Sequence, residues 1–300
     1  MSRISLSGIF PPIPTPFKAD EGIDYKHLQS NLDRWNQEPL AGYVVGGSNG
    51  EFVFLTVEER VEVVRAARQA IPRDRLLIAG SGMESTRETI DLTRRMAQAG
   101  ADVAILVTPS YYKSRMNVAA LEHHYSQVAD ASPIPVMLYS VPANTGLDLP
   151  AQAVIALATH PNIIGLKDSG GDITKIGFMA QETRNADFQI VAGSADFFLA
   201  ALGVGAVGCV PALGNIAGGK LAQLLECFKR GDIAGARAIQ LPLIEANTAV
   251  TARFGVPGLK AAMDMLGYYG GPVRSPLLPL SEADIVELRR VLIKVGLPIH

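Results

Sequence analysis

The stretch Asn162-Ile163-Ile164-Gly165-Leu166-Lys167-Asp168-Ser169-Gly170-Gly171 is an apolar run that ends abruptly in a lysine, followed shortly by two glycines. Asp172 comes next, and aspartate is a preferred helix N-cap residue. This order predicts a short buried strand, a tight turn and a new helix. Lys167 would then lie at the carboxyl end of its strand, which is the catalytic face in a (β/α)8 barrel.

Lys167 allows two interpretations. Burying an ammonium group costs free energy unless the site uses it, and burial favours the neutral amine, which is a nucleophile toward carbonyl compounds. A lysine at a strand end can instead extend its charged group to solvent along apolar surface. The rest of the chain decides between them.

Seven further apolar runs are typical of buried strands, and helical segments separate them. The eight predicted strands cover residues 8–14, 42–45, 76–79, 101–107, 135–139, 163–166, 188–191 and 206–210. Asp24 is the expected cap of a helix over residues 25–36, and Thr56 with Glu59 forms a capping-box pattern. Apolar strands that alternate with helices predict an α/β fold, a closed (β/α)8 TIM barrel. A doubly wound open sheet is the alternative, but no nucleotide fingerprint follows the first strand.

After Pro211 the alternation stops. Residues 217–229, 233–251, 257–265 and 283–295 have helical spacing without strands between them. We therefore expect a barrel over residues 1–215 and a C-terminal helical extension over residues 216–300 that packs on it.

The composition excludes several classes of function. The chain has 300 residues, of which 48% are hydrophobic, and its net charge of −2 indicates neither a nucleic-acid nor a membrane partner. Its apolar runs are too short to span a bilayer. Two cysteines, Cys209 and Cys227, favour a reducing compartment. Because no signal peptide or Arg-rich presequence is present, a cytoplasmic location is expected.

A few sequence patterns resemble binding motifs but lack the structural context that those motifs need. Gly203-x-Gly205-x-x-Gly208 matches a dinucleotide-binding pattern, but these glycines precede a strand rather than link a strand to a helix. No spacing of His, Cys, Asp and Glu suggests a metal site. Asp196, before Phe197 and Phe198, is interpreted as the cap of a helix.

The predicted strand ends bring a particular set of side chains together. They are Ser48, Asn49, Tyr111, Tyr112, Tyr139, Lys167 and Ser169. A set without a carboxylate pair or a cysteine does not suit metal-dependent hydrolysis or glycoside hydrolysis. One lysine with several phenols and hydroxyls suits Schiff-base chemistry, in which an amine forms an imine with a ketone and a phenol moves protons. No metal and no organic cofactor is expected.

Four motifs resemble the dihydrodipicolinate synthase and N-acetylneuraminate lyase family of class I aldolases. They are Gly8-Ile9-Phe10-Pro11-Pro12-Ile13-Pro14-Thr15-Pro16-Phe17, Gly47-Ser48-Asn49-Gly50-Glu51, Tyr139-Ser140-Val141-Pro142 and Gly165-Leu166-Lys167-Asp168-Ser169. The resemblance covers nearly the whole chain. It implies a lyase with a (β/α)8 barrel and C-terminal helices, assembled as a homotetramer, a dimer of dimers.

The resemblance also implies roles for individual residues. Lys167 would form the imine with pyruvate or a pyruvyl substrate, and Tyr139 would be the proton-shuttling phenol. Ser48 and Tyr112 would complete the relay, Tyr112 from a neighbouring subunit. Gly47, Ser48 and Asn49 would hold the pyruvyl carboxylate. The remaining expected substrate-binding residues are Ser169, Asn144 and Val207.

The chain departs from the synthase pattern in two places. Ser48-Asn49 replaces two threonines, and Asn144 stands where the synthase has an arginine that grips the carboxylate of aspartate semialdehyde. The surrounding stretches resemble 4-hydroxy-2-oxoglutarate aldolase. The resulting hypothesis is reversible cleavage of 4-hydroxy-2-oxoglutarate to pyruvate and glyoxylate. The alternatives are dihydrodipicolinate synthase, another 2-keto acid aldolase of the family, and a catalytically inactive barrel that binds a metabolite.

Overall fold

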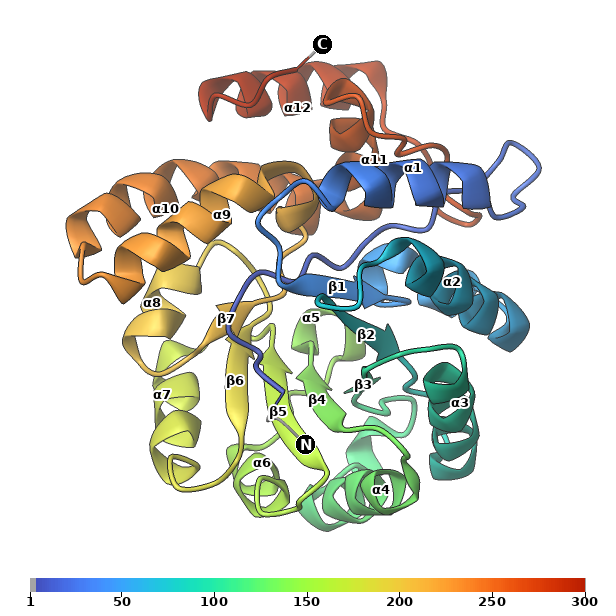
Figure 1. Cartoon of the computed structure of the whole chain (residues 1–300), viewed down its shortest axis with the longest axis vertical. Coiled ribbons are helices and arrows are strands. Elements are labelled where there is room, and N and C mark those ends of the chain that lie inside the picture. Colours follow the sequence, from blue (N-terminus) through green and yellow to red (C-terminus); the bar gives the residue numbers. More distant parts are fainter. Residues whose placement is uncertain (1–3, 300) are drawn as a thin grey trace.

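The computed structural model describes residues 4–299 as a curved sheet ringed by helices (Figure 1). The strands are β1 (Gly42–Val45), β2 (Leu76–Gly80), β3 (Val103–Val107), β4 (Val136–Ser140), β5 (Ile163–Asp168), β6 (Gln189–Ala192) and β7 (Gly208–Cys209). The helices up to β7 are α1 (Tyr25–Trp35), α2 (Val57–Ala70), α3 (Thr86–Gln98), α4 (Val118–Ala131), α5 (Pro142–Thr145), α6 (Ala151–Leu157), α7 (Ile173–Glu182) and α8 (Phe198–Gly203). The helices after it are α9 (Gly214–Lys229), α10 (Ile233–Thr248), α11 (Gly255–Met265) and α12 (Glu282–Lys294).

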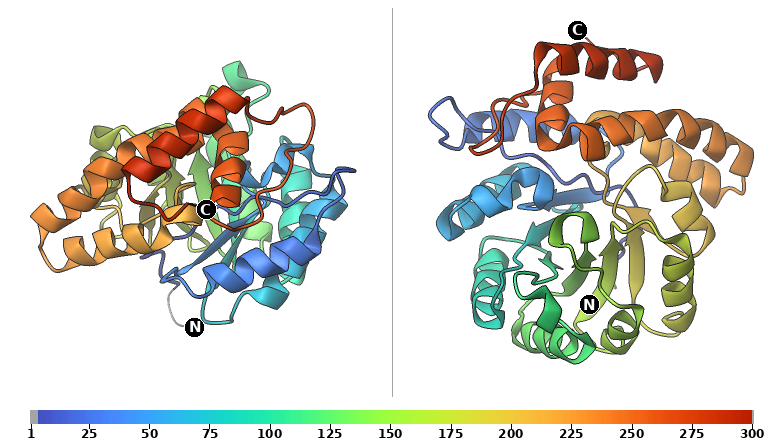
Figure 2. Two further views of the ribbon diagram at one scale, coloured as in Figure 1. Left: turned by 90° about the horizontal axis from the view of Figure 1, so that it is seen from above. Right: turned by 180° about the vertical axis from the view of Figure 1, so that it is seen from behind.

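The sheet is parallel, and each strand pairs with the next one along the chain, from β1 to β7. Helices lie outside it, as the two further views show (Figure 2). The predicted α/β barrel with a helical C-terminal region is confirmed. In the pairing of β4 with β5, Tyr139 lies opposite Lys167, so the strand register places these two side chains side by side.

The segment from Gly8 to Ile13 closes the barrel, but not as the continuous strand that the sequence predicted. Ile9 bridges to Cys209 in β7, and Pro12 bridges to Val44 in β1. The backbone N–H of Phe10 donates to the carbonyl of Cys209, at 2.9 Å. The prediction of a strand over residues 8–14 is corrected to isolated bridges, because prolines at 11, 12 and 14 have no N–H to donate to a ladder.

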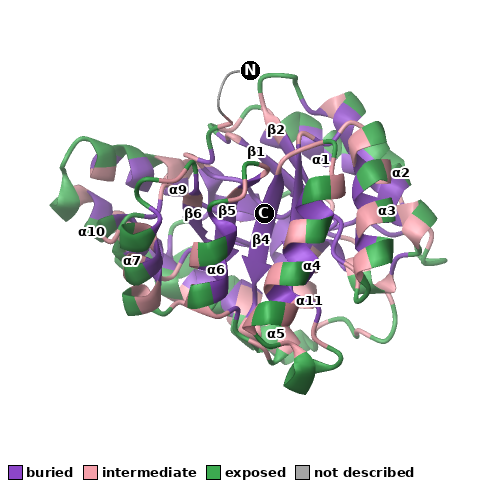
Figure 3. Ribbon diagram, turned by 90° about the horizontal axis from the view of Figure 1, so that it is seen from below, coloured by how far each residue is buried: buried purple, intermediate pink, exposed green. Residues whose placement is uncertain are grey.

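The apolar side chains form two layers. One cluster fills the barrel and includes Phe10, Val44, Ile78, Met137 and Tyr139. Neighbouring strand residues belong to the larger cluster between the sheet and the helices, as expected from the alternation of side chains along a strand. The strands are accordingly buried on both faces (Figure 3). Tyr139 is the polar-tipped member of the inner cluster.

The C-terminal helices pack on the barrel partly through α1. The indole N–H of Trp35 donates to the carbonyl of Asn215 at 2.9 Å, and Asn31 exchanges two hydrogen bonds with the backbone of Tyr269. The predicted division at residue 215 falls in the first turn of α9, which is kinked at Ala217. Over residues 4–299, no helix combines the length and apolar character needed to cross a bilayer.

Arg274 ties the C-terminal region to α2, and this contact gives a stability prediction. Its guanidinium binds both carboxylate oxygens of Glu59 at 2.8 Å and the carbonyl of Phe54 at 2.8 Å. We expect Arg274→Lys to lower the free energy of unfolding by about 1.5–3 kcal/mol, because lysine lacks the planar fork. Chemical denaturation at neutral pH measures the difference.

The control is the pH dependence of the difference in free energy of unfolding between wild type and Arg274→Lys. The hydrogen bond from Arg274 is the main reason that the pKa of Glu59 lies below its usual value. A depressed carboxyl pKa contributes stability above the unfolded pKa, and this contribution is lost as pH falls through the folded pKa. The gap between wild type and Arg274→Lys should therefore narrow in acid. A gap that is constant from neutral to acidic pH contradicts this explanation.

Candidate active site

Lys167 lies at the carboxyl end of β5, and only 4% of its surface is exposed. Its ammonium nitrogen is 4.0 Å from the centroid of the Tyr139 ring. The negative face of the ring attracts the cation, by about 0.5–2 kcal/mol in general. Among residues 4–299 no carboxylate forms an ion pair with Lys167; the neighbouring Asp168 lies near Lys175 instead. The buried amine is thus held beside a phenol and not neutralised by a carboxylate.

Ser48 reaches the same phenol from the loop after β1. Its Oγ is 3.4 Å from the hydroxyl oxygen of Tyr139. The loop turns sharply there, since Gly46 has φ of +69° and Ser48 begins a short 3₁₀ turn over Ser48–Gly50. A positive φ favours glycine, so Gly46 lets the loop fold back over the strand end. Ser48, Tyr139 and Lys167 therefore form one connected set.

The environment of Tyr139 changes its acidity. Burial alone raises the pKa of the phenol, but the Lys167 charge and hydrogen bonding to Ser48, Lys167 and Ser169 outweigh it, so the pKa lies below 10. A lower pKa makes the phenolate easier to form beside the amine. Such a tyrosine suits proton transfer at near-neutral pH better than an ordinary one does.

A cavity of about 620 Å³ opens above Lys167 and Tyr139. The polar side chains that line it include Ser48, Asn49, Asn144, Ser169, Ser194, Asp196 and Thr251. A second wall comes from the C-terminal region, through Val250, Thr251, Ala252, Gly255 and Val256. The site is therefore built by the barrel and the helical extension together.

The sequence analysis missed the C-terminal wall of the cavity. Part of that wall belongs to a π-helical turn, Ala249–Arg253, and Gly255 has φ of +58° just after it. π-Helical turns are often found at functional sites. The sequence shows only an ordinary helix up to residue 251, and its approach to the strand end at Lys167, some 80 residues earlier, depends on tertiary packing.

The structure brings together most of the residues predicted for the site. Ser48, Asn49, Tyr139, Asn144, Lys167 and Ser169 line the cavity. Gly47 lies with Tyr139 and Lys167 around a small space beneath it.

Two predicted residues lie elsewhere. Tyr112 is 71% exposed, and the structure does not bring it to the cavity of its own chain. Val207 comes before β7, at the amino side of that strand, and packs against the cluster inside the barrel; the residue that lines the cavity after β7 is Val210. Val207 is therefore corrected, because the cavity lies at the carboxyl side of the strands.

Asp168 fixes the turn that carries Ser169. Its Oδ1 accepts hydrogen bonds from the backbone N–H groups of Gly170 and Gly171, at 2.8 and 3.2 Å. Burial raises the pKa of Asp168, against the opposing effect of Lys175, whose Nζ lies 3.8 Å from Oδ2. The carboxylate beside Lys167 thus shapes the loop and leaves the amine free.

A buried ion pair links the Ser48 loop to the C-terminal region. Lys260 Nζ lies 2.6 Å from Glu51 Oε1, and each side chain is 1% exposed. The backbone N–H of Glu51 donates to the carbonyl of Ser48 at 3.1 Å. Glu51 has φ of +55°, a conformation that costs free energy for a residue with a side chain. The ion pair holds this residue in place and joins α11 to the loop that positions Ser48.

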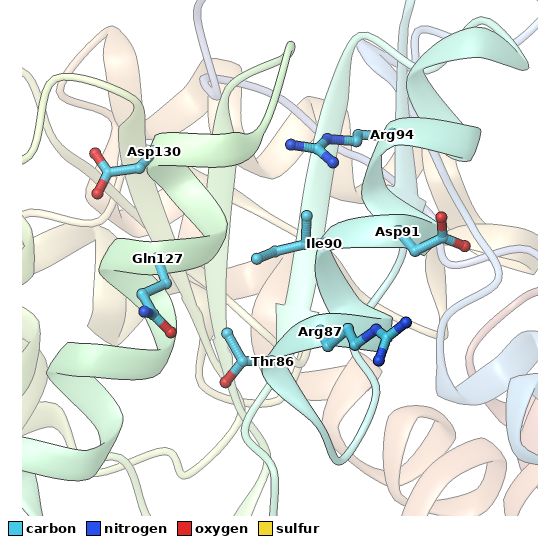
Figure 4. Close-up of a pocket in the computed structure, with 7 residues that line it drawn as sticks. All are labelled: Thr86, Arg87, Ile90, Asp91, Arg94, Gln127 and Asp130. Atoms are coloured by element: carbon cyan, nitrogen blue, oxygen red, sulfur yellow. The ribbon is translucent and has the colours of Figure 1, made fainter.

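Another groove within residues 4–299 has a different composition. A groove between α3 and α4 contains Thr86, Arg94 and Gln127, and the carboxylates of Asp91 and Asp130 point away from each other (Figure 4). In the described part of the chain, no group of three or more His, Cys, Asp or Glu side chains is placed to hold a metal ion.

Comparison with known proteins places this site in a family. The model of the dihydrodipicolinate synthetase family matches residues 5–295. The 4-hydroxy-tetrahydrodipicolinate synthase of Methanoculleus marisnigri is 37% identical over 96% of this chain and 99% of its own length. A crystal structure of the dihydrodipicolinate synthase DapA-2 of Bacillus anthracis has a TM-score of 0.93 at 29% identity, covering 98% of this chain and 99% of that one. The synthase of Acinetobacter baumannii, solved in complex with pyruvate, has a TM-score of 0.93 at 28% identity, covering 98% and 100%.

These relatives contradict the predicted substrate. Short motifs favoured cleavage of 4-hydroxy-2-oxoglutarate to pyruvate and glyoxylate, but the relatives that match nearly the whole chain are named for the synthase reaction. That prediction, including its glyoxylate product, is therefore wrong on this comparison, and the alternative synthase reaction is better supported. The fold and the family match over residues 5–295 agree. The chain belongs to the dihydrodipicolinate synthetase family and is a lyase of the class I aldolase type.

Proposed function

We propose that this enzyme joins pyruvate to aspartate semialdehyde through an imine on Lys167, the reaction for which its relatives are named. The observation that carries the proposal is the buried Lys167 amine, 4.0 Å from the Tyr139 ring, at the base of a 620 Å³ cavity. A neutral amine in such a place adds to ketones. A barrel that only binds a metabolite has no need of this arrangement.

In this proposal the reaction proceeds through an imine and an enamine. The Lys167 amine adds to C2 of pyruvate, and the adduct takes up a proton and loses water, which leaves a protonated imine. The imine draws electrons from C3, which loses a proton and becomes the enamine carbon. That carbon attacks the aldehyde, and the new alkoxide takes a proton. The amino group of the acceptor then loses a proton and adds to C2, and the bond from C2 to Lys167 breaks, which frees the product and the lysine amine. Tyr139 is the proposed carrier of these protons, with Ser48 Oγ 3.4 Å from its hydroxyl as the next partner.

In this proposal, uncharged groups bind the carboxylate of pyruvate and the carboxylate of aspartate semialdehyde. Gly47, Ser48 and Asn49 would hold the pyruvate carboxylate through N–H and side-chain donors, since they surround the approach to Lys167. Asn144 and Ser169 also line the cavity, and in this proposal they bind the carboxylate of the acceptor. The size of the cavity leaves room for both reactants.

Assembly would complete the site. Tyr111 and Tyr112 are 77% and 71% exposed, and their rings pack edge to face at 5.0 Å. A pair of exposed aromatic rings is typical of a surface that another subunit covers. We propose a homotetramer in which Tyr112 approaches a neighbouring chain. The buried free thiols of Cys209 and Cys227 support work in a reducing compartment, the cytoplasm.

Two measurements test the proposal. Borohydride reduction with pyruvate should add a covalent mass to the protein, which a mere binding module would not show. Purified enzyme with pyruvate and aspartate semialdehyde should then form 4-hydroxy-tetrahydrodipicolinate. A covalent adduct without this product, or a higher kcat/KM with glyoxylate as acceptor, would show that aspartate semialdehyde is not the acceptor. Either result would leave the imine chemistry intact.

Asn144 provides a specificity prediction. Asn144→Arg should raise kcat/KM for aspartate semialdehyde by up to about tenfold, because a charge-assisted hydrogen bond to its carboxylate replaces a neutral one. The KM for pyruvate should not change, since in this proposal Asn144 binds the acceptor and not pyruvate. Steady-state kinetics beside the matched variant Asn144→Gln measure the effect. A loss of activity with arginine would show that the acceptor carboxylate lies elsewhere.

A further inference from the structure

Lys175 lies in the first turn of α7, the helix that follows the strand of Lys167. A cation is unfavourable near the N-terminus of a helix, because the backbone N–H groups there carry a partial positive charge. The side chain of Lys175 is only 13% exposed, so water screens its charge poorly. This position suggests that the charge of Lys175 has a task that offsets its cost.

Two carboxylates surround the ammonium group of Lys175, one from the segment after β4 and one from the end of β5. Its Nζ lies 2.6 Å from Oδ1 of Asp148 and 3.8 Å from Oδ2 of Asp168. Asp148 Oδ1 also accepts a hydrogen bond from Ser140, the last residue of β4, at 2.9 Å. Lys175 therefore links the ends of the two neighbouring strands that carry the phenol and the amine of the site.

Asp168 is 1% exposed, and its two carboxylate oxygens have different surroundings. Oδ1 accepts hydrogen bonds from the N–H groups of Gly170 and Gly171, whereas Oδ2 is buried without a hydrogen-bond partner within residues 4–299. The charged groups that act on this carboxylate are Lys175, which stabilises it, and Asp148, which repels it. A buried charge without a counter-ion is costly, so Lys175 is what allows Asp168 to stay ionised there.

The charge of Asp168 matters for the reaction because Asp168 directly follows Lys167 in the chain. The side chains of neighbouring strand residues point to opposite faces, so the carboxylate and the amine are not in contact. A Coulomb interaction needs no contact, however, and it is strong where water is excluded. An uncompensated Asp168 carboxylate would stabilise the ammonium form of Lys167, which is not a nucleophile.

The other titratable groups around the reactive amine do not change when Lys175 is replaced. The Tyr139 ring packs on the amine from β4, and the buried Cys209 thiol lies near it in β7. Asp196 lines the cavity, and it is not the side-chain cap of α8 that the sequence predicted. A difference between wild type and a Lys175 variant in the behaviour of the amine therefore reports on the charge of Asp168.

We propose that Lys175 is a positioning residue that neutralises Asp168, so that the Lys167 amine can lose its proton and attack pyruvate. Lys175 does not itself line the cavity. It acts through Asp168, whose charge would otherwise hold a proton on the amine. This inference rests on the proposed imine at Lys167, and it does not depend on which aldehyde is the acceptor.

The test follows the rate of borohydride trapping with pyruvate against pH. Lys175→Met keeps the apolar part of the side chain and removes the charge. More of the Lys167 amine then stays charged at a given pH, so trapping should be about tenfold slower at neutral pH and equal to wild type in alkaline solution. This is a displacement of about one pH unit, as expected for two unit charges roughly 10 Å apart at an effective dielectric constant of about 20. Lys175→Arg keeps the charge and should resemble wild type.

The double variant Asp168→Asn/Lys175→Met separates charge from structure. Asparagine keeps an oxygen for the two glycine N–H groups and removes the negative charge, so this variant should recover the wild-type pH profile. Lys229→Met is the matched control, because Lys229 is exposed on α9 and pairs there with Glu226 at 3.1 Å. Its profile should equal that of wild type.

The possible outcomes decide between a role through charge and a purely structural one. A loss in Lys175→Met that is the same at every pH, or that Asp168→Asn does not restore, overturns the inference. Thermal unfolding of the same samples shows which variants are folded. If Lys175→Met does not fold, the double variant must still fold and trap pyruvate like wild type, and its failure overturns the inference as well.

Wild type shows whether the proposed function itself has failed. If pyruvate is not trapped at Lys167 of wild type, the imine proposal fails and this inference fails with it. If wild type is labelled at Lys167 and the profile of Lys175→Met does not move, only the role of Lys175 is lost.

Discussion

Lys167→Ala is expected to reduce turnover to background while the fold stays intact. In the proposed reaction the amine is the covalent link to the substrate, and no other described residue that lines the cavity carries a primary amine. Its removal should not destabilise the protein strongly, because it forms no ion pair within residues 4–299 and loses mainly the contact with the Tyr139 ring. Turnover assays with thermal unfolding of the same samples measure both parts.

The covalent adduct gives an independent check on this prediction. Borohydride with pyruvate should label wild type at Lys167 and should not label Lys167→Ala. Lys113→Ala is a matched control: Lys113 is exposed before α4, so this variant should be active and should be labelled at Lys167 like wild type. A label that maps to Lys113 or Lys175 would show that a different lysine forms the imine.

Tyr139→Phe should lower kcat by about 10²- to 10⁴-fold and change KM much less. The ring that packs on Lys167 remains, but the hydroxyl that contacts Ser48 is lost. Imine trapping should continue at a reduced rate, because the nucleophile is still present. Tyr43→Phe is the matched control: Tyr43 is buried in β1, and its hydroxyl hydrogen-bonds to Asn36 far from the cavity.

The pH profile tests the role of Tyr139 separately. If the phenolate accepts a proton during turnover, kcat of wild type rises with pH through the pKa of Tyr139, which lies below 10. That rise should be absent in Tyr139→Phe. A variant with wild-type turnover, or one that keeps the same rise, would remove Tyr139 from the proton transfers.

Local sequence patterns predicted the parts of the fold that depend on neighbouring residues. The apolar run before Lys167 is β5, and Thr56 with Glu59 forms both hydrogen bonds of the capping box. Asp172 caps α7 as expected. The strand end at Lys167 could be located because burial and turn formation are decided within a few residues.

Local sequence patterns could not predict contacts between segments that are far apart in the chain. The wall formed by Val250 and Thr251 depends on how the C-terminal helices pack on the barrel, and the Lys260–Glu51 ion pair joins residues more than 200 positions apart. Val207 was chosen from a predicted strand over residues 206–210, but the observed strand is only Gly208–Cys209. The acceptor was misjudged from local motifs around Asn144, because the shape of a whole cavity decides which aldehyde binds.

The bridges of Ile9 to Cys209 and of Pro12 to Val44 set an order of events during synthesis. The segment that closes the barrel leaves the ribosome first, but one of its two neighbours, β7, is made about 200 residues later. At about 5–20 residues per second, the nascent chain waits roughly 10–40 s with an open sheet edge. An open edge can pair with another chain and aggregate. The prolines at 11, 12 and 14 remove N–H donors from this waiting segment, so the feature that breaks the strand also protects the unfinished protein.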